Sequence, residues 1–154
     1  IKELIRKKAK VVVLAHQGRK GDSDFTSLKQ HAKLLNKFVR IKFTPDVIGK
    51  KAVKAIKSLK EGEAILLDNV RYLEDEMKPS PESKMVKTLA PLFDIYINDA
   101  FSVSHREQTS IISFPQILDS GVGRLMEHEV KSIEKLKINN VFVYLRVFLK
   151  LVKK

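Results

Sequence analysis

The chain has 154 residues, of which 44% are hydrophobic and 31% are charged, a composition typical of one compact domain rather than of a disordered chain. The absence of cysteine excludes disulfide frameworks, thiol nucleophiles and cysteine-ligated metal sites. The net charge of +12 favours anionic partners, a class that includes phosphorylated metabolites, nucleic acid and acidic membrane surfaces.

Short apolar runs alternate with longer amphipathic segments along the chain, a pattern that predicts β-α-β units and a parallel sheet. We therefore expect an α/β fold with a doubly wound, mainly parallel, Rossmann-like sheet. The expected strands lie at residues 10–15, 39–43, 63–68, 93–98 and 140–145. The expected helices lie at residues 27–37, 46–59, 80–92 and 122–137.

Capping residues mark the expected helix boundaries. Asp46 follows Pro45 and is predicted to be the N-cap of the second helix, and Gly62 is predicted to stop it. Ser80, with Pro81 at the first helical position, is predicted to open the third helix. The lysines of the second helix lie opposite its apolar side and are expected to form a solvated face.

The first ten residues are charged throughout, and the apolar run that follows is too short for the core of a signal peptide. No uninterrupted apolar stretch approaches the ~20 residues of a membrane span. We therefore expect a soluble protein of the cytoplasm.

Basic and polar side chains follow the carboxyl ends of three predicted strands, the edge at which doubly wound sheets bind their ligands. They are His16, Gln17, Gly18 and Arg19 after the first strand, Arg71 after the third, and His105 and Arg106 after the fourth. A guanidinium group can grip two phosphate or carboxylate oxygens at once. Gly18 is expected where the backbone turns with positive φ or makes a close approach. The implied ligand is a small, multiply charged anion.

Three strings carry a family resemblance: KVVVLAHQGR, LLDNVRY and YINDAFSVSHR, followed by Gly121, Val122, Gly123 and the string LMEHEVKSIEKL. In this order and spacing they resemble the strand-end motifs of phosphoglycerate kinase. The resemblance implies that residues 1–137 are part of a phosphoglycerate-binding domain that ends in the interdomain helix. It also implies that residues 138–154 are a divergent remnant of the start of the nucleotide-binding domain.

The reaction that the resemblance implies is reversible phosphoryl transfer between ATP and 3-phosphoglycerate, which gives 1,3-bisphosphoglycerate and ADP in glycolysis and gluconeogenesis. The family holds ATP or ADP with Mg²⁺ in a second domain, and we expect no nucleotide site in this chain.

Carried over by position, residues 16–19 bind the substrate, Arg71 and Arg106 hold its phosphate, and His105 contributes hydrogen bonding. No catalytic residue is carried over, because the catalytic arginine of the family would precede Ile1. The chain alone is expected to bind 3-phosphoglycerate at millimolar concentration and to be inactive as a kinase.

Several positions depart from the family pattern. Lys20 stands where the family has proline, and Ser102 and Val103 stand where it often has glycine and threonine. Gln108 replaces the second histidine of the HRxH string. The three arginines are retained, so the predicted ligand class is unchanged.

A second class of function is a non-enzymatic basic α/β module that binds nucleic acid or other polyanions through its lysine-rich helices. The aromatic fraction of 7% and the absence of tryptophan disfavour it.

A third interpretation makes residues 141–154 an amphipathic helix for a membrane or a partner. We expect neither a nucleic acid nor a membrane partner, and no metal site, because the four histidines lack paired ligand spacing. The family is usually monomeric, but an open sheet edge and the apolar run 141–145 predict self-association.

Overall fold

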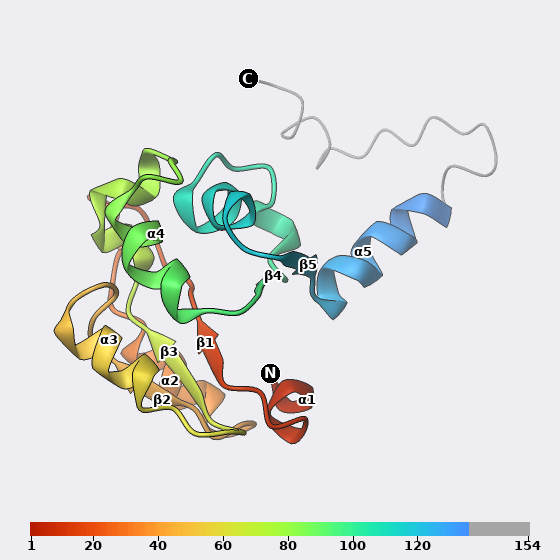
Figure 1. Cartoon of the computed structure of the whole chain (residues 1–154). Coiled ribbons are helices and arrows are strands. Elements are labelled where there is room, and N and C mark those ends of the chain that lie inside the picture. The colour runs from red at the N-terminus through yellow and green to blue at the C-terminus, as the bar shows by residue number, and fades with distance from the viewer. Residues whose placement is uncertain (136–154) are drawn as a thin grey trace. The chain divides into compact units, whose positions relative to one another are not determined.

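The computed structural model describes residues 1–135 and has an α/β architecture with parallel strand pairs (Figure 1). One sheet has the strand order β1-β3-β2, and β4 and β5 form a second sheet. The strands are β1 (Val11–Val13), β2 (Lys42–Thr44), β3 (Ala64–Leu67), β4 (Tyr96–Asn98) and β5 (Ser120–Val122). The helices are α1 (Lys2–Arg6), α2 (Lys29–Leu35), α3 (Lys50–Lys57), α4 (Lys84–Leu89) and α5 (Arg124–Glu134). The predicted α/β fold class is confirmed.

The chain forms two compact units. Unit 1 contains Ile1–Asp94 and Glu107–Leu118, and therefore holds the β1-β3-β2 sheet with α1 to α4. Unit 2 contains Ile95–Arg106 and the described residues from Asp119 onward, and therefore holds β4, β5 and α5. The chain thus leaves unit 1, returns to it for residues 107–118, and leaves it again.

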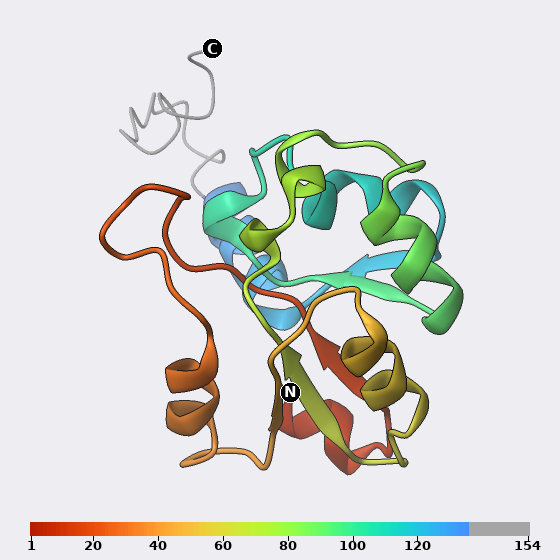
Figure 2. The ribbon, with the colours of Figure 1, turned by 90° about the vertical axis from the view of Figure 1, so that its left-hand side faces the viewer.

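The central strand of unit 1, β3, is buried along its whole length. Its residues Ala64 and Leu66 belong to one core cluster with Leu28 and Ala32, which lie at the start of α2 and within it. The orange helix α2 and the yellow helix α3 lie on opposite sides of these strands (Figure 2). Because helices cover both sides of the sheet, the sequence of β3 is continuously apolar instead of alternating.

The strand β2 begins at Lys42 and not at residue 39 as predicted. The reason is that the Asn36 side chain occupies both backbone groups of Ile41. Its Nδ2 donates to the Ile41 carbonyl at 2.7 Å, and its Oδ1 accepts the Ile41 N–H at 3.1 Å. The parallel ladder therefore starts one residue further along, where Lys42 is in register with Ile65.

The second sheet also differs from its prediction. β4 begins at Tyr96 and not at residue 93, because the Phe93 N–H donates to the Ala90 carbonyl at the end of a short 3₁₀ turn. β5 was not predicted as a strand at all, and it pairs in parallel with β4. The strand expected at residues 140–145 lies outside the described residues.

The helix predicted at residues 46–59 is present as α3, but both of its predicted ends were wrong. Its N-cap is Gly49 and not Asp46, although the Asp46 carboxylate accepts the N–H groups of Gly49 at 2.9 Å and Ala52 at 3.0 Å. Burial raises the pKa of Asp46, but these backbone donors outweigh it, and the pKa is lowered overall. The helix ends at Lys57, so Gly62, with φ of +74°, belongs instead to the turn before β3.

The other predicted helices are present with shorter bounds. Residues 27–37 contain α2, residues 80–92 contain α4 and residues 122–137 contain α5. The prediction that Ser80 opens α4 was wrong, because Ser83 is the N-cap and its Oγ accepts the Val86 N–H at 3.2 Å. The Ser80 Oγ accepts the Glu82 N–H at 3.1 Å in the turn that precedes the helix.

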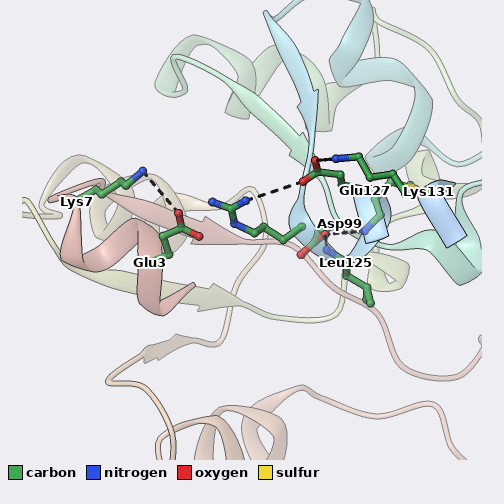
Figure 3. A network of polar contacts seen from close by, with 8 residues as sticks. Glu3, Lys7, Asp99, Leu125, Glu127 and Lys131 are labelled. Atoms are coloured by element: carbon green, nitrogen blue, oxygen red, sulfur yellow. Dashed lines mark hydrogen bonds and ion pairs between the residues drawn. The ribbon is translucent and has the colours of Figure 1, made fainter. Parts of the chain in front are cut away.

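The start of α5 is capped by an aspartate from the end of β4. Asp99 Oδ1 accepts the N–H groups of Leu125 at 2.8 Å and Met126 at 3.1 Å (Figure 3). The N-cap residue is Gly123, and a Cβ built there would lie 2.3 Å from the Asp99 Cγ. Glycine at residue 123 therefore leaves room for the carboxylate that caps the helix.

Gly123→Ala is expected to destabilise unit 2 by about 1 kcal/mol or more, the typical cost of losing a helix N-cap. The new methyl group would displace the Asp99 carboxylate, and protection of the Leu125 and Met126 amides from hydrogen exchange would fall. Gly121→Ala is the matched control, because its Cβ would meet only the Ile97 Cδ1 at 3.4 Å. Equal amide protection in the two variants would contradict this role of Gly123.

Candidate functional site

Two segments of unit 1 meet beyond the carboxyl ends of β1 and β3. The first is the strand-end loop, residues 16–27, and the second is the DNVR turn, residues 68–71. Asp68 accepts the Ser27 hydroxyl at 3.0 Å and the Leu28 N–H at 2.9 Å. The Val70 N–H donates to the Ala15 carbonyl at 3.1 Å. The DNVR turn therefore holds the chain on both sides of the strand-end loop.

Asn69 holds the loop from within. Its Nδ2 donates to the Gln17 carbonyl at 2.7 Å and to the Thr26 carbonyl at 2.9 Å. Its Oδ1 accepts the Arg71 N–H at 3.1 Å. The residue is 0% exposed, so these bonds form out of contact with water.

Gly18 and Arg71 are joined directly. The Arg71 Nη1 donates to the Gly18 carbonyl, a bond that connects residues 53 positions apart in the sequence. Gly18 has φ of +63°, so the predicted positive φ at this residue is confirmed. Two of the segments that the sequence assigned to one site are thus in contact.

The remaining loop residues are more exposed. His16 and Gln17 are half-buried, and the Gln17 Nε2 donates to the Asp24 carboxylate at 3.1 Å. Arg19 is exposed, as are residues 20–24 that follow it. Phe25 packs edge-on against Tyr72 with ring centroids 5.1 Å apart, whereas the exposed residues 19–24 have no core of their own.

A buried carboxyl group contributes to the electrostatics near Arg71. Glu76 is 0% exposed, and Ser110 donates to it from its N–H at 3.0 Å and from its hydroxyl at 2.7 Å. Burial raises the pKa of Glu76, while the Ser110 hydrogen bonds and the positive charge of Arg71 oppose that rise. The same two hydrogen bonds fasten residues 107–118, which follow Arg106 in the chain, to the rest of unit 1.

The other two predicted site residues belong to unit 2. The Arg106 N–H donates to the Val103 carbonyl at 2.9 Å, which forms a tight turn after the 3₁₀ segment Phe101–Val103. His105 is exposed and Arg106 is half-buried. Because Arg106 and Arg71 lie in different units, the convergence of all three arginines stays a prediction.

No group of three or more His, Asp or Glu side chains that could hold a metal ion occurs within residues 1–135. In the same part of the chain, no helix is both long and apolar enough to cross a membrane.

Comparison with known proteins identifies the family. Residues 1–145 match the family described as phosphoglycerate kinase. The chain belongs to the phosphoglycerate kinase family. It is 50% identical over 143 residues to the phosphoglycerate kinase of Saccharolobus solfataricus and 46% identical over 142 residues to that of Methanopyrus kandleri. Each match covers 88% of this chain but 35% of the relative, so the chain spans about a third of the length of these phosphoglycerate kinases.

Solved phosphoglycerate kinases share its fold. The crystal structure of the enzyme from Pyrococcus horikoshii OT3 is similar with a TM-score of 0.86 and 32% identity, over 90% of this chain and 36% of that one. The structure from Coxiella burnetii gives a TM-score of 0.71 and 29% identity, over 86% of this chain and 33% of that one. The family resemblance seen in the strand-end strings is confirmed by the sequence comparisons and by the structural comparisons.

In this member of the phosphoglycerate kinase family, the sequence had identified the basic residues of the candidate site but not those that hold them. No holding role was predicted for Asp68, Asn69 or Glu76, because their partners lie more than 30 positions away in the sequence. The string LLDNVRY shows that Asp68 and Asn69 directly follow a fully apolar strand, but it does not indicate which atoms they contact.

Proposed function

We propose that this chain supplies part of the 3-phosphoglycerate site of a phosphoglycerate kinase. The observation that carries the proposal is the hydrogen bond from Arg71 to the Gly18 carbonyl, which joins two predicted substrate-binding segments. In the proposed site, residues 16–19 contact the substrate, Arg71 and Arg106 hold its phosphate, and His105 adds a hydrogen bond. The whole reaction would be the reversible transfer of a phosphoryl group between ATP and 3-phosphoglycerate, in glycolysis and gluconeogenesis in the cytoplasm.

Arginine suits this role because its planar fork matches the oxygens of a phosphate group. Each charge-assisted contact contributes about 1.5 to 3 kcal/mol, so three arginines offer roughly 5 to 9 kcal/mol in total. Association costs about 4 kcal/mol or more. We therefore expect the chain to bind 3-phosphoglycerate with a millimolar dissociation constant.

We assign no residue of this chain to the nucleotide or to its magnesium ion. The sequence contains neither of the common glycine-rich phosphate cradles, and residues 1–135 contain no acidic cluster for a cation. We therefore propose that residues 1–137 are substrate-binding and that ATP or ADP with Mg²⁺ binds elsewhere in a complete kinase. Phosphoryl transfer depends on positioning and on cationic stabilisation of the transferred group, so this chain alone would not catalyse it.

Calorimetric titration of the full chain with 3-phosphoglycerate tests the binding proposal. Arg71→Ala and Arg106→Ala are each expected to weaken binding by about tenfold or more, because each removes a charge-assisted contact. Arg40→Ala is the matched control: it removes one exposed arginine that precedes β2, at the opposite end of the strands from the strand-end loop. Equal affinities in all four proteins would discard the assigned site.

A coupled enzyme assay tests the proposal that the chain alone is inactive. The purified chain is expected to show no ATP-dependent turnover of 3-phosphoglycerate. Turnover above the rate of a sample without protein would refute this part of the proposal while leaving the binding site unaffected.

A further inference from the structure

The carboxamide of Asn69 has a position that no contact with a ligand explains. It is 0% exposed, and both of its N–H groups and its oxygen are engaged by main-chain atoms. A carboxamide offers two donors and one acceptor oxygen in a single rigid plane. The side chain therefore fixes three backbone positions relative to one another.

Those three positions define the geometry of the candidate site. The Gln17 and Thr26 carbonyls lie on the two arms of the strand-end loop, at 2.7 Å and 2.9 Å from the Asn69 Nδ2. The Arg71 N–H, at 3.1 Å from the Asn69 Oδ1, belongs to the residue of the DNVR turn that carries the guanidinium. The Asn69 carboxamide thus holds the two arms of the strand-end loop together and fixes their position relative to the DNVR turn.

Residues 19–24 of the loop are exposed and have no core to order them. The anchors made by Asp68 and Val70 reach only the chain outside the loop or at its last residue. Two sets of side-chain bonds close the arms on each other: the exposed bond from Gln17 Nε2 to the Asp24 carboxylate at 3.1 Å, and the bonds of Asn69, whose side chain is buried.

We propose that Asn69 is a positioning residue of the 3-phosphoglycerate site, one that holds the strand-end loop in its binding shape before the ligand arrives. This inference rests on the proposed function. A preordered loop lowers the entropic cost of binding, so the benefit appears as affinity for the ligand. Aspartate could not replace Asn69, because it has no N–H groups and would face the two carbonyl oxygens with a negative charge.

Asn69→Ala in the full chain tests this role, and Asn36→Ala is the matched control. The Asn36 carboxamide also makes two donated bonds and one accepted bond to the main chain, at 2.8, 2.7 and 3.1 Å, but it lies at the other end of the strands, just before β2. Both variants lose two donated bonds and one accepted bond to the main chain, although Asn36 is exposed and Asn69 is buried. Only Asn69→Ala removes bonds to the strand-end loop.

Limited digestion with trypsin measures how well the strand-end loop is ordered, because Arg19 and Lys20 are exposed cleavage sites within it. Asn69→Ala is expected to accelerate cleavage at these two residues by about tenfold or more, while Asn36→Ala leaves their rate unchanged. Calorimetry with 3-phosphoglycerate is expected to show an affinity at least about tenfold weaker for Asn69→Ala alone, since small misplacements of binding groups are costly. If Asn69→Ala fails to fold, Asn69→Ser is measured in the same two assays in its place. The shorter serine side chain would not reach the Gln17 or the Thr26 carbonyl.

The outcomes separate this inference from the proposed function. Absence of binding by the unsubstituted chain would overturn the proposed function, whatever the cleavage rates. Equal cleavage at Arg19 and Lys20 in the Asn69 and Asn36 variants would overturn the positioning role, whatever the ligand result. Faster cleavage with unchanged affinity would also overturn it, because the loop would then be held for stability alone.

Discussion

Phe114→Ala is expected to lower the free energy of unfolding of unit 1 by about 3 to 5 kcal/mol, the usual cost of truncating a fully buried phenylalanine. The Phe114 ring is 0% exposed, and its centroid lies 6.3 Å from that of Phe93. Removing the ring leaves a cavity and deletes this aromatic contact. It also loosens residues 107–118, which cross back into unit 1 directly after Arg106. Urea unfolding followed by circular dichroism measures the loss.

Phe38→Ala provides the control for this prediction. Phe38 has the same side chain but is 70% exposed, so its truncation should change the stability by less than about 0.5 kcal/mol. Overlapping urea curves for the two variants would show that residues 107–118 do not contribute to the core of unit 1.

The segment that carries Phe114 could not be predicted from the sequence. Residues Thr109–Ser113 form a π-helical turn and Phe114–Gln116 a 3₁₀ turn, where no regular apolar period is present. Side-chain bonds to distant partners decide the conformation: the Thr109 hydroxyl donates to the Asp75 carbonyl at 2.5 Å, and Ser110 donates to Glu76. Such bonds depend on contacts that exist only in the folded chain.

Strand prediction succeeded where burial alone specifies the strand. The residues of β3 are at most 2% exposed, and their apolar side chains leave few alternatives. β5 was missed because Ser120 and Gly121 have low β-propensity, and only their register with Tyr96 and Ile97 of β4 makes them a strand. The residues of β3 indicate a strand by themselves, whereas β5 is a strand only because of its pairing with β4 in the folded chain.

In the candidate site, too, some features could be predicted from the sequence and others depend on the folded chain. Arginines at the ends of predicted strands could be identified because charge and topology are both readable from sequence. The hydrogen bonds of Asp68 and Asn69 to loop atoms could not, since nothing local indicates which carbonyl a buried carboxamide will reach. That these residues bind an anion stays a prediction from the sequence, and the structure adds how unit 1 holds Arg71 against the loop.

Gly18→Ala is expected to be the most disruptive single-atom addition in the strand-end loop. Gly18 has φ of +63°, a conformation that costs a residue with a Cβ about 1 to 2 kcal/mol. The added Cβ would also lie 2.5 Å from the Phe25 backbone nitrogen and 2.6 Å from the Asp24 carbonyl carbon. Because these neighbours are backbone atoms, the loop must rearrange, and the Gly18 carbonyl would leave Arg71.

Gly21→Ala separates the overlap from the conformational cost. Gly21 has φ of +99°, and a Cβ there would meet no atom within 4 Å, so this variant carries the strain without the overlap. We expect Gly18→Ala to lose more stability than Gly21→Ala in thermal unfolding. We also expect Gly18→Ala alone to lose about tenfold or more in affinity for 3-phosphoglycerate, since the bond that orients the Arg71 guanidinium would be broken. Indistinguishable affinities in the two variants would mean that the guanidinium keeps its position without the Gly18 carbonyl, and that the loop and the arginine are independent parts of the site.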